Sequence, residues 1–292
     1  MANQPGLKHL CNALATPDQL SNSSSSIDGV PRDLEASIRC AGVQLTQAAG
    51  VLLRLSQDII AQAIVTFSRF WLGADGGSLR VQDVSAAALY LTAKLSFQPT
   101  SPRSVLNVYT LLLSQNASPL WFVNPHGAPA QPSDGYILSE GEYQSARLQL
   151  LHIESVILRT LGFETHVALP YTIALTYLQT LDAISVARRV IEYLNTALLS
   201  PQLLYVTHQP NALAVAAIYL AAREEGVKLV DGEWWEVFDV DREELGFLVV
   251  GMGSTEGFIR AEREQWKNRT IPMVADEVEA EIERRRMMDQ GE

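Results

Sequence analysis

The chain has 292 residues, of which 47% are hydrophobic, and it carries a formal net charge of −11. This length fits one large or two medium-sized domains with a proper core. The negative charge disfavours direct binding of nucleic-acid phosphates by the folded part. No stretch reaches the roughly 18 consecutive apolar residues that a membrane span requires, so we expect no association with a membrane.

Cysteine and targeting patterns predict a reducing, intracellular environment. Cys11 and Cys40 are the two cysteines, too few for a disulfide framework. The N-terminus has no basic region followed by a long apolar run, so no signal peptide is expected. Residues 1–32 are rich in Ser, Pro and Asn, and we expect them to form a mostly disordered arm.

A first set of five helices is predicted between residues 33 and 161. Apolar residues recur there at the 3.6-residue spacing of a helix, and Gly or Pro residues separate the periodic stretches. The expected helices span residues 33–53, 57–72, 80–96, 102–114 and 140–161. Residues 115–138 lack this periodicity and contain four prolines, which indicates a long loop or an insertion.

A second set of helices is predicted after Pro170. The expected spans are residues 171–181, 185–199, 210–225, 233–238 and 242–267, followed by a helical tail within residues 268–292. No segment alternates strongly enough between apolar and polar residues to predict a strand, so the fold class is all-α.

An internal repeat links the two sets. The sequence AAALYLTAKLSF at 86–97 echoes AVAAIYLAAREEG at 214–226, which aligns Lys94 with Arg223. Each copy is the third helix of its set, which favours duplication of one helical domain. Chance similarity between two alanine-rich buried helices is the alternative.

Two charges stand out in otherwise apolar helices. Lys94 ends the helix 80–96, which is apolar on nearly all sides and is therefore expected to be buried. Glu154 lies on a leucine stripe of the helix 140–161, where burial is costly unless the carboxylate is paired. The two residues form either a salt bridge within the chain or a pair displayed at the centre of an apolar docking surface, and their spacing leaves both open.

The motifs resemble those of the cyclin family, and within it the cyclin L branch. Residues 40–71, with their QAAG-LLRL-Q core, resemble the start of a cyclin box. Further matching stretches follow in the same order, at residues 91–109, 153–167, 169–181 and 208–223. The resemblance implies tandem cyclin folds of five helices each, an N-terminal box at 33–168 and a C-terminal fold at 169–267.

The resemblance also implies a function and a site. Cyclins are regulatory subunits of cyclin-dependent serine/threonine kinases, and those like cyclin L act in the nucleus, in RNA polymerase II transcription and pre-mRNA processing. The matching kinase-binding residues are Lys94, Glu154, Leu91, Leu95, Leu158 and Phe163. The chain would then supply no catalytic group and need no cofactor or metal, and its partner would be the kinase, without nucleic acid.

Two departures from the family pattern are visible. Cyclins usually follow the lysine with an aliphatic residue and two glutamates, whereas Leu95, Ser96 and Phe97 follow Lys94 here. The stretch that corresponds to the substrate-docking patch of cell-cycle cyclins, Ile38–Leu45, has Gly42 in its middle, so we expect no docking of that kind.

Other functional classes fit less well. The five histidines stand apart, and no metal-binding, phosphate-loop or nucleophile motif occurs, so an enzyme is not predicted. The alternative function is a cyclin-fold transcription factor or scaffold that binds proteins or DNA without activating a kinase. The acidic charge disfavours the DNA-binding version.

Overall fold

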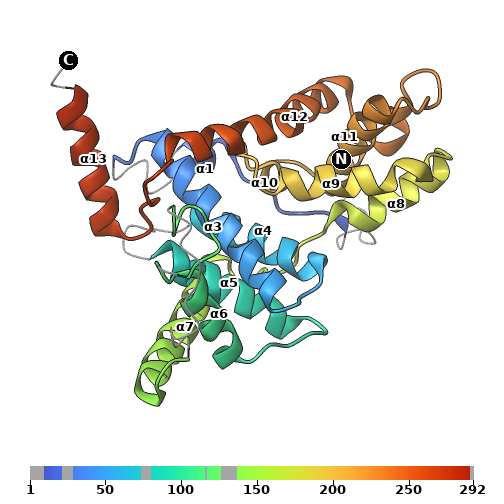
Figure 1. Ribbon diagram of the computed structural model, residues 1–292. Coiled ribbons are helices and arrows are strands. Elements are labelled where there is room, and N and C mark those ends of the chain that lie inside the picture. Colours follow the sequence, from blue (N-terminus) through green and yellow to red (C-terminus); the bar gives the residue numbers. More distant parts are fainter. Residues whose placement is uncertain (1–9, 22–28, 74–79, 116, 126–136, 290–292) are drawn as a thin grey trace. The chain divides into compact units, whose positions relative to one another are not determined.

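A computed structural model describes residues 10–21, 29–73, 80–115, 117–125 and 137–289, and within these ranges it contains helices and no strands (Figure 1). The predicted all-α fold is therefore confirmed. None of the helices in the described ranges is long and apolar enough to cross a membrane. Half of the predicted loop at 115–138, and half of the arm at 1–32, lie outside the described residues.

The chain divides into two compact units, named here after their central helices. The α5 unit comprises Pro17–Thr165 and Glu262–Glu292, and the α11 unit comprises Met1–Thr16 and His166–Ala261. The α5 unit contains α1 (Pro17–Ser21), α3 (Arg32–Leu52), α4 (Gln57–Gly73), α5 (Val81–Leu95), α6 (Pro102–Leu112), α7 (Glu140–Thr160) and α13 (Ala275–Asp289). The α11 unit contains α8 (Pro170–Thr180), η2 (Ile184–Val186), α9 (Ala187–Ala197), α10 (Leu204–Thr207), α11 (Pro210–Glu225), η3 (Trp234–Phe238) and most of α12 (Arg242–Gln265).

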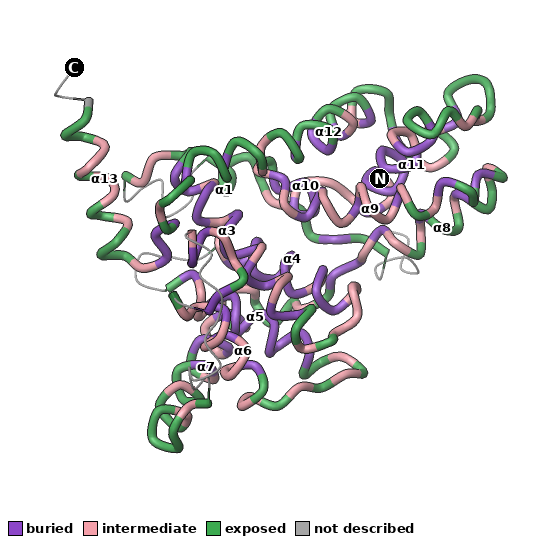
Figure 2. Tube along the Cα trace, viewed as in Figure 1, coloured by how far each residue is buried: buried purple, intermediate pink, exposed green. Residues whose placement is uncertain are grey.

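Helix α5 forms the centre of its unit. It packs against α3, α4, α6 and α7, and its residues from Val84 to Ala93 are all buried (Figure 2). Its three consecutive alanines present little side-chain volume, which lets the neighbouring helices approach its axis closely. The sequence prediction of a helix buried on all sides is confirmed.

Two features show how tightly α3 lies against its neighbours. A Cβ atom added to Gly42 would lie 2.5 Å from Phe67 Cζ and 2.8 Å from Val81 Cγ1, so only glycine fits there. The Thr46 hydroxyl donates to the Gly42 carbonyl and lies 2.7 Å from the Ser85 hydroxyl, which lies 2.6 Å from that of Tyr109. Since Thr46 has used its proton, Ser85 must donate to Thr46 and Tyr109 to Ser85. This buried chain of hydroxyls joins α3, α5 and α6.

Helix α11 plays the same part in the other unit, where it packs against α8 and α9 and is buried along most of its length. The first helix of each set also ends alike. Arg54 after α3 and Asp182 after α8 both adopt a positive φ, 56° and 51°. In both cases the N–H of this residue and the N–H of the residue after it close a Schellman motif onto the last turns of the helix. The shared geometry supports the predicted duplication.

Several details differ from the sequence prediction. Part of the arm expected to be disordered is ordered: α1 lies within it, and Asn12 is buried in the α11 unit. The Asn12 side chain exchanges two hydrogen bonds of 2.8 Å with the Ala168 backbone, and the Gln209 side chain exchanges two with the Asn12 backbone. The short helix predicted at 233–238 is a 3-10 helix, and α10 was not predicted.

The C-terminal segment packs onto the α5 unit, although the sequence placed residues 268–292 in a separate tail. Trp266 is 1% exposed, and its indole N–H donates to the Ser37 hydroxyl at 3.2 Å. Backbone hydrogen bonds tie Ile271 to Phe122 and Met273 to Val81. The segment therefore completes the unit that α3 to α7 begin.

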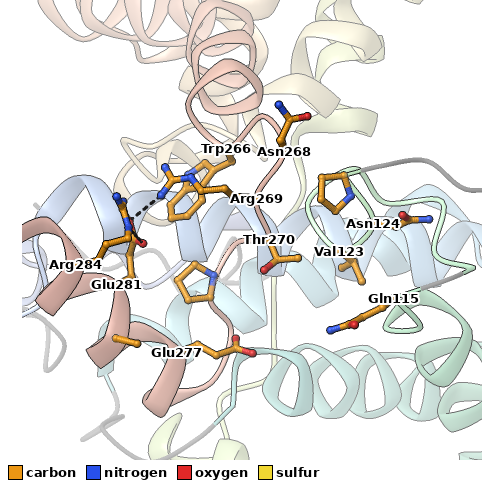
Figure 3. A pocket seen from close by; sticks show the side chains of 13 residues that line it. Gln115, Val123, Asn124, Trp266, Asn268, Arg269, Thr270, Glu277, Glu281 and Arg284 are labelled. Carbon is orange, nitrogen blue, oxygen red and sulfur yellow. Dashed lines mark hydrogen bonds and ion pairs between the residues drawn. The ribbon is translucent and has the colours of Figure 1, made fainter.

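One carboxylate anchors α13 within this segment. Glu281 accepts hydrogen bonds from Arg284 at 2.7 Å and from Arg285 at 3.0 Å, and Arg269 lies 3.5 Å away (Figure 3). The hydrogen bonds from Arg284, followed by those from Arg285, lower the pKa of Glu281 to about 2. Arg285 also bonds Asp33 of α3 at 2.6 Å, so the cluster connects α13 to the rest of the unit.

Replacing Gly42 by Ala should destabilise the protein by about 1–3 kcal/mol, because the added methyl group would overlap the fully buried Phe67 ring. The measurement is the thermal unfolding midpoint. Gly257→Ala is the matched control: nothing lies within 4 Å of its added Cβ, so this change within α12 should raise stability by about 0.5–1 kcal/mol. Equal midpoints for the two variants would contradict the close packing of α3.

Replacing Glu281 by Gln should lower the unfolding midpoint at pH 7 and increase hydrogen exchange in α13. A carboxylate whose folded pKa is depressed contributes stability above its ordinary pKa of 4.5, and this stability is lost as the pH falls towards 2. The difference in unfolding midpoint between the wild type and the variant should therefore decrease below pH 4.5. The control is Glu279→Gln, at an exposed position of α13. A difference in unfolding midpoint between wild type and Glu281→Gln that does not change with pH would refute the anchoring role of Glu281.

Candidate functional site

The two charges singled out in the sequence meet in the structure. Lys94 lies in the last turn of α5, and its ammonium donates to Glu154 Oε1 of α7 at 2.9 Å. The Lys94 side chain is 53% exposed, whereas that of Glu154 is 7% exposed. The hydrogen bond to Glu154 raises the pKa of Lys94 above its ordinary value, so the ammonium stays charged at neutral pH. The Tyr90 ring adds a further contact, 5.7 Å from the Lys94 nitrogen.

This geometry contains features of both alternatives left open by the sequence. The Glu154 side chain is almost fully buried, so its negative charge must be compensated within the chain. Lys94 supplies the compensating positive charge. Lys94 uses one of its three N–H donors for Glu154 and reaches the surface with the others available to an acceptor outside the chain. The pair is a salt bridge, and its cationic half is also displayed at the surface.

The end of α7 sets Leu158 and Phe163 beside each other. The N–H of Gly162 bonds to the carbonyl of Arg159, and the N–H of Phe163 bonds to that of Leu158 at 2.8 Å. Gly162 and Phe163 both have positive φ, and together these bonds make a Schellman closure, which commonly pairs the two apolar residues at its ends. Leu158 lies one helical turn beyond Glu154 and is half-buried, while Phe163 is 68% exposed.

The end of α5 presents a second pair of apolar side chains. Leu95 is 62% exposed and Phe97 is 74% exposed. Ser96 fixes the turn between them, because its hydroxyl donates to the Ala93 carbonyl and accepts from the N–H of Gln98. Phe97 was not among the predicted site residues. A large apolar residue directly after the charged end of a buried helix was the signal that would have included it.

One predicted site residue is not at the surface. Leu91 is 3% exposed and packs inside the α5 unit. It therefore supports the end of α5 from within and offers no surface to a partner. Leu91 was predicted to contact the kinase directly, but the structure shows it buried, because the helix is covered on all sides from Val84 to Ala93.

The equivalent end of α11 lacks this arrangement. Arg223 aligns with Lys94 and is exposed, but it forms no salt bridge with any residue in the described part of the chain. Its neighbour Glu224 is bound instead by Arg189, at 2.7 Å. The Lys–Glu pair is thus a property of the α5 unit alone.

A pocket of 720 Å³ lies elsewhere in the α5 unit, between α13 and the loops that carry Asn124 and Thr270 (Figure 3). Its two arginines, Arg269 and Arg284, are both paired with Glu281. Both cations of the lining are therefore already compensated by Glu281, while the carboxylate of Glu277, which also lines the pocket, accepts a hydrogen bond from the Met273 N–H.

Sequence comparisons relate the chain to cyclin L, although no family model matches it. It is 31% identical to Cyclin-L2 of Mus musculus over 240 residues, which is 80% of this chain and 43% of that protein. It is 29% identical to Cyclin-L1-1 of Oryza sativa subsp. japonica over 227 residues, 77% of this chain and 50% of that protein. The chain thus spans half or less of the length of these relatives.

Solved structures agree on the fold. A chain in the crystal structure of the yeast RNA Pol II CTD kinase CTDK-1 complex matches with a TM-score of 0.65 at 10% identity, covering 93% of this chain and 82% of that one. A chain of the CAK complex from Chaetomium thermophilum matches with a TM-score of 0.52 at 16% identity, covering 92% and 78%. With the duplicated helical units, the buried central helices and the cyclin L sequence motifs, these matches show that the chain has the cyclin fold and is similar in sequence to cyclin L.

Proposed function

We propose that this protein is the regulatory subunit of a cyclin-dependent serine/threonine kinase, which it binds and activates through the surface around Lys94 and Glu154. The observation that carries the proposal is the salt bridge at the end of α5, whose lysine is 53% exposed while its glutamate is 7% exposed. Leu95 and Phe163 supply exposed apolar area on either side. Large apolar side chains that become buried anchor protein interfaces, and direct hydrogen bonds accompany them.

In the proposed complex, Lys94 donates its remaining N–H groups to backbone carbonyls of the kinase next to its αC helix. The salt bridge to Glu154 fixes the position of the Lys94 ammonium. The exposed apolar residues pack against αC and keep it turned inward, where its glutamate pairs with the lysine that positions the ATP phosphates. The cyclin contributes no catalytic group. It binds the active conformation of the kinase more tightly than the inactive one, and the difference between these two affinities sets how far the equilibrium moves towards the active conformation.

The cellular process proposed is RNA polymerase II transcription with pre-mRNA processing, in the nucleus. The similarity to cyclin L supports it, as does the likeness in fold to a chain of a complex described as an RNA Pol II CTD kinase. In the alternative, a cyclin-fold scaffold without a kinase, Lys94 would serve only to compensate the charge of Glu154.

The test is a charge exchange between the two residues, Lys94→Glu combined with Glu154→Arg. The exchange keeps a salt bridge between α5 and α7 but removes the exposed ammonium. The wild type and the exchanged variant are each screened against a panel of purified cyclin-dependent kinases from the organism of origin. The two readouts are binding to the kinase and phosphorylation of a peptide substrate by the kinase. We expect the dissociation constant of the kinase that the wild type binds to rise at least about 30-fold, or about 2 kcal/mol, with a matching loss of activation.

The matched control is Arg223→Glu, at the equivalent position of α11, which should leave both readouts unchanged. Normal binding and activation by the exchanged variant would disprove the proposed surface. Binding by the wild type without any activation would favour the scaffold instead.

A further inference from the structure

Four exposed apolar side chains lie at two neighbouring turns of the α5 unit. Val51 and Leu52, at the end of α3, are 61% and 46% exposed, and Leu95 and Phe97, at the end of α5, are 62% and 74% exposed. We call these four residues the turn patch. Contiguous apolar surface of this kind on a folded protein marks a site of interaction.

A specific hydrogen bond holds the two turns together. The backbone N–H of Ser56, between α3 and α4, donates to the side-chain Oε1 of Gln98, between α5 and α6, at 3.1 Å. Gln98 directly follows Phe97, and Ser56 follows the Schellman closure of α3. This hydrogen bond therefore brings the turn after α3 next to the turn after α5.

The turn patch is also rigidly presented. Ser96 caps α5, Gln98 bonds both Ser96 and Ser56, and Arg54 closes α3 with a φ of 56°. A fixed turn that displays an aromatic ring loses little conformational entropy when a partner covers it. The ring of Phe97 thus has the properties of an interface anchor.

We infer that the turn patch extends the kinase-binding surface, and that Phe97 and Leu52 select a kinase whose facing surface is apolar. The inference rests on the proposed function. Leu95 and Phe97 follow Lys94 within three residues of the chain, so the turn patch continues the proposed kinase-binding surface. We therefore assign the same kinase as the partner that covers the patch. Neither Ser96 nor Phe97 carries a carboxylate, so a basic patch on the kinase would have no counter-charge at this position. We therefore expect the facing surface of the kinase to be apolar.

The experiment uses the full chain and the purified kinase that the wild type binds. Phe97→Glu should raise the dissociation constant about 30-fold or more, since a carboxylate would be desolvated against an apolar surface. Leu52→Glu should raise it about fivefold or more, although it lies on another helix. Val237→Glu is the matched control: this η3 residue is 78% exposed in the α11 unit, and its replacement should leave the affinity unchanged.

The outcomes separate this inference from the proposed function. If the Lys94 and Glu154 exchange abolishes binding while Phe97→Glu and Leu52→Glu bind like the wild type, the turn patch is not part of the interface and the inference fails alone. Sedimentation of the chain without kinase tests a second copy as the occupant. A wild-type dimer that Phe97→Glu makes monomeric, with unchanged affinity for the kinase, would assign the patch to self-association and overturn the inference. If the wild type binds none of the kinases, both proposals fail.

Discussion

The burial of α5 from Val84 to Ala93 is the constraint on which the α5 unit depends. Four helices pack around one that is only 15 residues long, and this requires small side chains and polar groups that satisfy one another. The alanines supply the first requirement, and the hydroxyl chain of Thr46, Ser85 and Tyr109 supplies the second. Burial raises the pKa of the Tyr109 hydroxyl, so it remains a neutral donor at physiological pH.

The same burial explains why the candidate site lies where it does. Between Val84 and Ala93, α5 is buried and carries no charged residue, and in its last turn Lys94 reaches solvent and meets Glu154 of α7. The site thus lies at the end of the central helix of the unit, and its geometry follows from the packing of that helix. Leu91 belongs to that packing, whereas Leu95 and Phe97 belong to the surface.

Much of this architecture follows from sequence patterns, because helical periodicity is a local property. The long helices begin and end within a few residues of their predicted limits, and the charge complementarity of Lys94 and Glu154 correctly predicts their pairing. The burial of Leu91 was missed because a helix that is apolar on all sides does not reveal where its exposed turn starts. The attachments of Asn12 to Ala168 and of Trp266 to Ser37 were missed because they join residues far apart in the chain and leave no periodic signal.

Those two attachments make each unit discontinuous along the chain. The α11 unit includes residues from the beginning of the chain, and the α5 unit includes residues from its end. During synthesis, the α5 unit therefore lacks Trp266 and α13 until residues 166–261 of the α11 unit have been translated, and until then the surface of α3 around Ser37 stays uncovered. A nascent chain of this kind depends on late, long-range contacts, which fold slowly and expose apolar surface to chaperones.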